Sequence, residues 1–335
     1  MKLNILPRKT MTKEAFLTAY PDDRSITLDG FLHEPPFRHF TKSGGYLINF
    51  DHHTGGDRLS MRSTSGQVMM ALKLGLADCI DNAQVFVNDC DQDVCLATWL
   101  LQHPHRVVRT SEPLLNRLVW AEDTLDATGG SYPFAESSDL RETLHWIFAP
   151  YENAAAKVST IDENIMRSII EAVWKRIDEY LMGLAGKVER PQSEFVFTPF
   201  LSNSTRHGLD GFLMIDEQQG LLARQTMARA GIRSFVSVKH HNAGPLTTNG
   251  NRWDYKIGSL APFSFFPLLA IYDALNKEEA FKYMALGQPW STTQGWGGSD
   301  LIGGGPRNGS LLPPKDVQAI VLKVMEGTTV TKEPR

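Results

Sequence analysis

The sequence predicts an α/β fold, with a mainly parallel sheet in a first domain and a smaller α/β domain after it. Short apolar runs alternate with helical patterns through the first half of the chain, and each run ends in polar residues. Strands that alternate with helices are typical of parallel sheets. A polar, proline-containing segment at 187–194 then interrupts the pattern. We therefore expect two domains, residues 1–190 and 191–335.

Four apolar runs in the first half have the character of buried strands. They are SITL at 25–28, GYLINF at 45–50, VFV at 85–87 and RLVW at 117–120. Asp29, Asp51 and Asn88 follow the first three runs directly, and Glu122 and Asp123 follow the fourth. In open α/β sheets, ligands bind beyond the carboxyl ends of the strands. The sequence therefore places acidic groups where such a sheet binds its ligands.

Helical periodicity accounts for the segments around these strands. Residues 64–77 carry Val68, Leu72 and Leu76 on one face, and a second helix begins near Val94. A third, long helix follows Thr160, which forms a capping box with Glu163. Its apolar face comprises Ile161, Ile165, Ile169, Val173, Ile177 and Leu181, and its pattern ends near Gly183 or Gly186.

The second half of the chain mixes further strands with a glycine-rich tail. Strands are expected at 195–200, 212–215 and 234–238, and a helix at 219–231. Seven glycines then lie between Gly295 and Gly309. Such a loop can present backbone N–H groups to an anion, although a merely flexible loop is the alternative.

Composition excludes several classes of protein. The formal net charge of -4 removes any global electrostatic argument for wrapping duplex nucleic acid. Three cysteines in a chain of this length favour a reducing compartment over a disulfide framework. We expect no signal peptide from the first residues, and no apolar stretch of the sequence reaches membrane-helix length. We expect a cytoplasmic protein without a membrane partner, and a homodimer stays open as an alternative to a monomer.

The sequence Asp51-His52-His53 is the first motif that suggests chemistry. A carboxylate beside two imidazoles suits Mn²⁺, Zn²⁺ or Fe²⁺ better than Ca²⁺. Adjacent strand residues point to opposite faces, so both histidines can reach one metal only if the strand has already ended. Gly55-Gly56 makes such a turn reasonable. The alternative is a solvated loop with two surface histidines.

A second motif, Asp89-Cys90-Asp91-Gln92-Asp93, opens the helix near Val94. An acidic first turn is stabilised by the helix macrodipole and needs no metal. Three alternating carboxylates are nevertheless more than a cap requires, and they would repel one another without a cation. A bound divalent ion relieves that repulsion.

Two further acidic positions complete the pattern. Asp123 and Asp126 precede a glycine pair, and Asp29 precedes Gly30. Each could simply be a turn or cap residue. Four acidic strand ends in one sheet together predict a two-metal centre that acts on a phosphoryl group.

Basic and glycine residues are expected to contact an anionic substrate. Arg58 and Arg62 follow the Asp-His-His motif and could bind phosphate bidentately, or form ion pairs with a nearby acid. His241 could contact substrate or lie in a surface turn. The residues that we assign to substrate binding are Arg58, Arg62, His241, Gly298, Ser299, Gly304 and Arg307.

These motifs resemble those of the DHH phosphoesterase superfamily. LINFDHH is similar to its signature, and VFVNDCDQDVCLATWLL is similar to its Asp-x-Asp-x-Asp turn. RSTSGQVMMALKLGL is similar to the helix after the signature, and LDATGGSYPF to a later ligand segment. The glycine-rich tail resembles the substrate loop of the DHH-associated domain. The Asp-x-Asp-x-Asp motif precedes the Asp-His-His in the family, whereas this chain has the reverse order.

The resemblance implies roles for the motif residues. Asp89, Asp91 and Asp93 would bind one or both metals, and His52 the second. His53 would contact phosphate or protonate the leaving oxygen, together with Asp51. The remaining metal ligands would be Asp126, Asp123 and Asp29.

We therefore expect a metal-dependent phosphohydrolase with two divalent ions, most simply Mn²⁺, that activate a hydroxide. Its substrate would be a small phosphodiester, such as a dinucleotide or short oligonucleotide. The reversed motif order, and a tail loop without the family's histidine, motivate a second hypothesis. This is a non-catalytic nucleotide- or metal-binding module on the same fold. A dinuclear hydrolase of a non-phosphate substrate is a third.

Overall fold

The chain is a mixed α/β protein that divides into two compact units. The computed structural model describes residues 1–21, 24–108, 111–130, 132, 134, 139–157, 162–186, 212–215, 227, 231–240, 252–259, 266–291, 295–306 and 308–327. The first unit comprises Met1–Ala127 and Phe134–Gln192, and the second comprises Thr128–Pro133 and Ser193–Arg335. Each unit contains its own sheet.

The first unit is built on a five-stranded sheet with the order β1-β5-β2-β4-β3. Its strands are β1 (Lys2–Ile5), β2 (Arg24–Leu28), β3 (Phe37–Phe40), β4 (Tyr46–Phe50) and β5 (Gln84–Val87). The pairs β1–β5, β5–β2 and β2–β4 are parallel, and only β3 runs antiparallel to its neighbour. The carboxyl ends of β5, β2 and β4 therefore lie next to one another at one edge.

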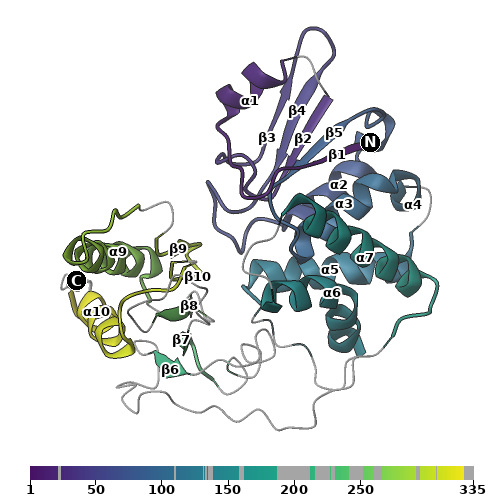
Figure 1. Ribbon diagram of the computed structural model, residues 1–335. Coiled ribbons are helices and arrows are strands. Elements are labelled where there is room, and N and C mark those ends of the chain that lie inside the picture. The colour runs from purple at the N-terminus through teal and green to yellow at the C-terminus, as the bar shows by residue number, and fades with distance from the viewer. Residues whose placement is uncertain are drawn as a thin grey trace, which may run out of the picture. The chain divides into compact units, whose positions relative to one another are not determined.

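Helices cover both faces of this sheet (Figure 1). They are α1 (Lys13–Ala19), α2 (Thr64–Lys73), the 3₁₀ turn η1 (Leu76–Asp78), α3 (Gln92–Gln102), α4 (Pro104–Val108), α5 (Pro113–Ala127), α6 (Asp139–Lys157) and α7 (Glu163–Leu181). Successive side chains along β4 and β5 point to opposite faces of the sheet. Leu47 and Phe86 pack with Phe16 of α1, whereas Ile48 and Val85 belong to the larger core under the other helices.

Sequence periodicity anticipated β2, β4, β5, α2, α3 and α7, with two corrections. The strand expected at 117–120 is wrong, because these residues lie inside helix α5. Leu115, Leu118 and Leu125 are buried along that helix, so a helical period continues on both sides of the short apolar run. Asp123 and Asp126 consequently lie on a helix and not at a strand end.

The start of α7 is the second correction. Asp162, and not Thr160, is the N-cap, because its Oδ1 accepts a 2.9 Å hydrogen bond from the backbone N–H of Ile165. The helix ends as the sequence predicts, with Gly183 at φ +75°. The N–H groups of Gly183 and Leu184 donate to the carbonyls of Tyr180 and Glu179 at 2.9 and 2.8 Å.

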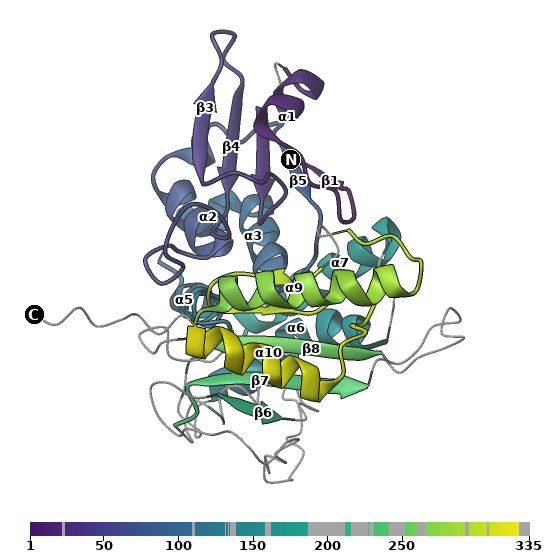
Figure 2. The same cartoon turned by 90° about the vertical axis from the view of Figure 1, so that its left-hand side faces the viewer.

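The second unit has a sheet with the order β6-β7-β8-β10-β9. Its strands are β6 (Leu213–Ile215), β7 (Ser234–His240), β8 (Trp253–Ser259), β9 (Gly297–Gly298) and β10 (Ile302–Gly304), and its helices are α9 (Leu268–Ala285) and α10 (Pro314–Gly327). Only β6 and β7 are parallel. Figure 2 shows α9 and α10 side by side over this sheet, where Ile271 and Val321 join Ile257 in one core.

The strands expected at 212–215 and 234–238 correspond to β6 and β7. The strand expected at 195–200 and nearly all of the helix expected at 219–231 lie outside the described residues. None of the helices within the described ranges is long and apolar enough to span a bilayer.

Candidate metal centre

Strand β2 brings Asp29 to the carboxyl edge of the first sheet through a tight turn. Asp29 and Gly30 have φ values of +49° and +72°, a left-handed conformation that aspartate tolerates better than most side chains. The backbone N–H of Asp29 donates to the carbonyl of Phe50 at 2.9 Å. Asp29 is thereby held beside the residues that follow β4.

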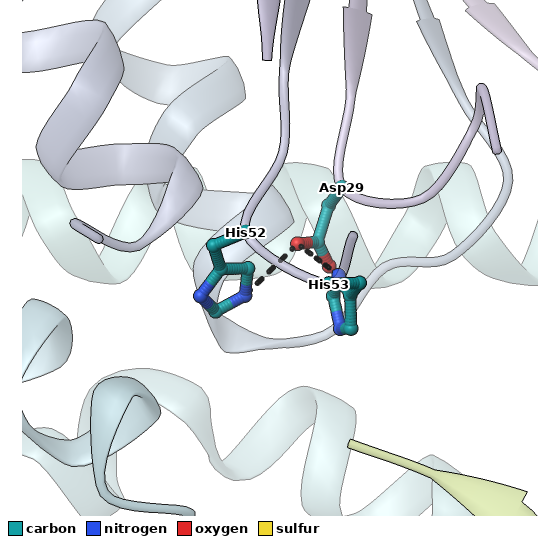
Figure 3. A group of neighbouring side chains, drawn as sticks. All are labelled: Asp29, His52 and His53. Carbon is teal, nitrogen blue, oxygen red and sulfur yellow. Dashed lines mark ion pairs between the residues drawn. The ribbon is translucent and has the colours of Figure 1, made fainter. Parts of the chain in front are cut away.

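His52 and His53 both approach Asp29, because β4 has already ended at Phe50 (Figure 3). Nε2 of His52 lies 3.4 Å from Oδ1 of Asp29, and Nδ1 of His53 lies 3.5 Å from the same oxygen. His52 is buried, whereas the side chain of His53 is 41% exposed. The turn thus brings both imidazoles to one carboxylate, as the motif required.

Asp51 forms a hydrogen bond with the side chain of His53. Its Oδ1 lies 2.9 Å from Nδ1 of His53, and it also accepts the backbone N–H groups of His53 and Gly30 at 3.2 and 3.1 Å. Asp51 is fully buried, and its Oδ2 has no hydrogen-bond partner among the residues that the structure describes. An imidazole oriented by a buried carboxylate is the usual arrangement of a general acid or base.

The N-terminus of α2 positions two of the acidic side chains. The backbone N–H groups of Thr64 and Ser65 donate to Oδ2 and Oδ1 of Asp93 at 2.6 and 2.8 Å. The hydroxyl of Thr64 donates to Oδ1 of Asp29 at 3.0 Å. A helix N-terminus stabilises carboxylates through its free N–H groups and its dipole. The sequence analysis assigned no role to Thr64 and Ser65, although Ser-Thr-Ser before an apolar helix indicates such an N-terminus.

Helix α5 contributes Asp126. Its Oδ2 lies 2.9 Å from Nε2 of His52, and its Oδ1 accepts a 2.7 Å hydrogen bond from Nη2 of Arg58. Nε of Arg58 also donates to the backbone carbonyl of Asp126 at 3.1 Å. Arg58 is 6% exposed, so it forms a buried ion pair and not the solvated one that the sequence left open.

Asp123 lies one turn earlier on α5 and has other partners. Its Oδ1 accepts the backbone N–H of Ser63 at 2.6 Å, and its Oδ2 pairs with Nη1 of Arg62 at 3.1 Å. The side chain of Arg62 is 59% exposed. Asp123 therefore supports the N-terminus of α2 beside the candidate centre.

Asp91 and Asp89 flank the start of α3. Asp91 is the N-cap of this helix, since its Oδ1 accepts the N–H of Val94 at 3.0 Å. Asp89 accepts the N–H of Cys90 at 2.7 Å. Burial and the charges of Asp29 and Asp89 raise the pKa of Asp91 well above its usual range. Its capping role matches the metal-free alternative for this motif.

Two overlapping groups of side chains offer ligand atoms within 4.8 Å of one another, among the residues that the structure describes. One contains Asp29, His52 and His53, and the other contains His52, Asp93 and Asp126. Because Nδ1 of His53 is bonded to Asp51, we define the cation cluster as Asp29, His52, Asp93 and Asp126. Three carboxylates and one imidazole are a donor set that suits Mn²⁺.

Electrostatics within this cluster favour a cation. Burial, reinforced by the charges of Asp126 and Asp29, raises the pKa of Asp93 to about 6. Burial also opposes the charged form of His52, but its hydrogen bonds to Asp126 and Asp29 outweigh this and raise its pKa to about 11. The pKa of Asp29 is lowered despite burial, because the charge of His53 and the hydrogen bond from His52 stabilise the carboxylate. Positive charge keeps these acids ionised, and a divalent cation would supply it.

Glu122, on α5, is a buried acid near the cluster that the sequence analysis did not assign. It is 3% exposed, and its Oε2 forms no hydrogen bond within the described ranges. Burial, followed by the charges of Asp93, Asp126 and Asp91, raises its pKa well above the usual range. Burial therefore favours the neutral form of Glu122. The helical period of α5 could have indicated this burial, because Glu122 lies four residues after Leu118 and three before Leu125 on the buried face.

The glycine-rich residues of the second unit form a hairpin. Gly298 pairs with Gly303, and the hydroxyl of Ser299 accepts the N–H groups of Leu301 and Ile302 at 3.2 and 3.1 Å. A Cβ atom on Gly298 would lie 2.4 Å from Cα of Gly303, so the close approach requires glycine. Gly304 belongs to β10. Of the other residues assigned to substrate, His241 and Arg307 lie outside the described residues.

Comparisons with protein-family models, with curated proteins and with solved structures found no match to this chain. The geometry of these side chains is therefore the basis for inferring a function.

Proposed function

We propose that this protein is a metal-dependent phosphoesterase that hydrolyses a small phosphodiester. One observation carries the proposal. The His53–Asp51 pair, with its imidazole half exposed, lies directly beside a cluster of carboxylates and an imidazole that suits a divalent cation. Acid–base catalysis and cation binding at one edge of a parallel sheet are the two elements that phosphodiester hydrolysis needs.

The residues present fit a divalent cation. Asp29, His52, Asp93 and Asp126 would hold it. Ligand atoms of His52, Asp93 and Asp126 already lie within 4.8 Å of one another, and Oδ1 of Asp29 lies 3.4 Å from Nε2 of His52. Nε2 of His52 faces the carboxylates of Asp29 and Asp126, and its buried Nδ1 has no hydrogen-bond partner in the described part of the chain. A bound cation would neutralise charge on phosphate oxygens and lower the pKa of a water molecule.

The chain's own residues perform the remaining steps in this proposal. Asp51 holds His53 in the tautomer with a proton on Nδ1, and Nε2 forms no hydrogen bond with any described residue. After protonation, Nε2 can deliver a proton to the leaving oxygen. The charge of Asp29 and the hydrogen bond to Asp51 raise the pKa of His53 against the effect of burial, which favours the protonated form that this role needs.

Phosphate chemistry fits this site better than amide chemistry because Arg58 is present. A guanidinium matches the oxygens of a phosphate in geometry and charge. The net charge of -4 favours a short, small substrate over a long anionic polymer.

The proposal is tested with purified protein, Mn²⁺ and a set of dinucleotides, beside the His52→Ala variant. We expect Mn²⁺-dependent release of mononucleotide, lost in His52→Ala and retained in His105→Ala, since His105 is exposed on α4. The absence of product from both dinucleotides and bis(p-nitrophenyl) phosphate would refute the proposal. Nucleotide binding without turnover would instead support a non-catalytic module.

A further inference from the structure

Arg58 introduces a fixed positive charge into the cation cluster. Its side chain is buried, and it reaches Asp126 through Nη2 at 2.7 Å from Oδ1 and through Nε at 3.1 Å from the backbone carbonyl. Nη2 also lies 3.4 Å from Nε2 of His52. Since a guanidinium keeps its proton at any ordinary pH, this charge is a permanent part of the site.

Several ligand atoms around the cluster already have partners. Oδ1 of Asp126 is occupied by Arg58, which leaves only Oδ2 for a metal. Both oxygens of Asp93 accept backbone N–H groups from the N-terminus of α2. Nδ1 of His53 is bonded to Asp51. A carboxylate that binds two ions about 3.5–4 Å apart uses both of its oxygens, and Arg58 holds one oxygen of Asp126.

The positive charge of Arg58 also disfavours a second divalent ion at this site. A second divalent ion beside Oδ1 of Asp126 would meet Nη2 of Arg58, which lies 2.7 Å from that oxygen, and the two positive charges would repel each other. Arg58 already neutralises the carboxylate that such an ion would need.

We propose that the site binds a single divalent cation and that the guanidinium of Arg58 takes the place of a second one, where it binds substrate phosphate. The inference rests on the proposed phosphoesterase function and narrows the two ions expected from the sequence to one. Nη1 of Arg58 forms no hydrogen bond with any residue that the structure describes, so it is available to a phosphate oxygen. A two-metal centre stabilises the phosphoryl group from two sides, and an arginine can supply one of these contacts.

The test counts manganese. The full chain is stripped with chelator, dialysed and titrated with Mn²⁺ by calorimetry, and bound metal is then measured by mass spectrometry. We expect one ion per chain in the wild type and two in Arg58→Met, which keeps an apolar stem but frees Oδ1 of Asp126. Arg62→Met is the matched control, because Arg62 is exposed and pairs with Asp123, and it should bind one ion.

A conservative variant separates the charge of Arg58 from its shape. Arg58→Lys keeps a positive charge and should still bind one Mn²⁺. It should nevertheless bind inorganic phosphate about tenfold more weakly in the presence of Mn²⁺, because lysine lacks the planar fork. This variant and the wild-type count remain decisive if Arg58→Met does not fold, which circular dichroism would show.

The outcomes separate the two proposals. Two ions in the wild type, or unchanged phosphate affinity in Arg58→Lys, would overturn this inference and leave the phosphoesterase function standing. One ion in a folded Arg58→Met would likewise overturn the role given to Arg58. No Mn²⁺ bound to the wild type would instead refute the proposed function itself.

Discussion

Nδ1 of His53 lies 2.9 Å from Oδ1 of Asp51, in a pair whose carboxylate is fully buried and whose imidazole is 41% exposed. The hydrogen bond fixes the orientation of the ring, because the same oxygen also accepts the backbone N–H groups of Gly30 and His53. His53 therefore presents Nε2 in a constant direction beside the cation cluster. General acids in hydrolases require this kind of fixed geometry.

Replacing His53 with glutamine should slow hydrolysis of a dinucleotide by about 10²–10⁴-fold, because the leaving ribose oxygen needs a proton. The same variant should lose much less activity on bis(p-nitrophenyl) phosphate, whose leaving group departs as a stable anion. Comparison of kcat for the two substrates gives the measurement. An equal loss on both would contradict the general-acid role.

The carboxylates of Asp126 and Asp123 lie one turn apart on α5 and should respond differently to amide substitution. Asp126→Asn weakens a ligand of the cation cluster, so Mn²⁺ affinity should fall by about tenfold or more. Asp123→Asn should keep the affinity within about twofold, because Asp123 bonds Ser63 and Arg62. Calorimetric titration of both variants with Mn²⁺ measures the two affinities. Equal losses of Mn²⁺ affinity would show that Asp123 is also a ligand.

Glu122 should make the stability of the protein depend on pH. Its pKa is raised by burial above the ordinary value of 4.5, so the folded protein holds this proton more tightly than the unfolded chain does. The free energy of unfolding should therefore fall as pH rises above that value, and Glu122→Gln should remove this part of the fall. Urea unfolding of both proteins across the pH range, with Mn²⁺ absent, provides the comparison. Parallel pH profiles would rule out a buried neutral acid.

Glu279 should stabilise the second unit. It is fully buried on α9 and accepts hydrogen bonds from Nε1 of Trp296, the N–H of Leu311 and the hydroxyl of Ser310. Glu279→Gln places an amide N–H₂ against these donors and should lower the free energy of unfolding by about 1–3 kcal/mol.

The neighbouring Glu278→Gln is the control for that change. Because Glu278 is exposed, this variant should change the free energy of unfolding by no more than about 0.5 kcal/mol. Denaturant unfolding followed by tryptophan fluorescence measures both variants. Equal stabilities would mean that the carboxylate of Glu279 contributes nothing that an amide cannot.

The local pattern of apolar and polar residues predicted those elements whose periodicity and length both indicate the same secondary structure. Strands β2, β4 and β5 and the start of α3 were anticipated because each apolar run is bounded by polar residues. Residues 117–120 were misassigned, since four apolar residues fit a strand or a buried helix equally well. The start of α7 moved by two residues because Asp162 caps as well as Thr160 could.

By itself, the sequence determined where acids and histidines follow the strands, because strand ends are encoded locally. It thereby located Asp29, His52 and Asp93 at the edge of one sheet. Only the tertiary structure decided which acids meet, since this depends on strand order and on how α2 and α5 pack. That packing directs Asp126 to His52 but Asp123 to the N-terminus of α2, and it buries Arg58 and Glu122 near the same acids. Contacts between residues so distant along the chain have no local pattern from which to predict them.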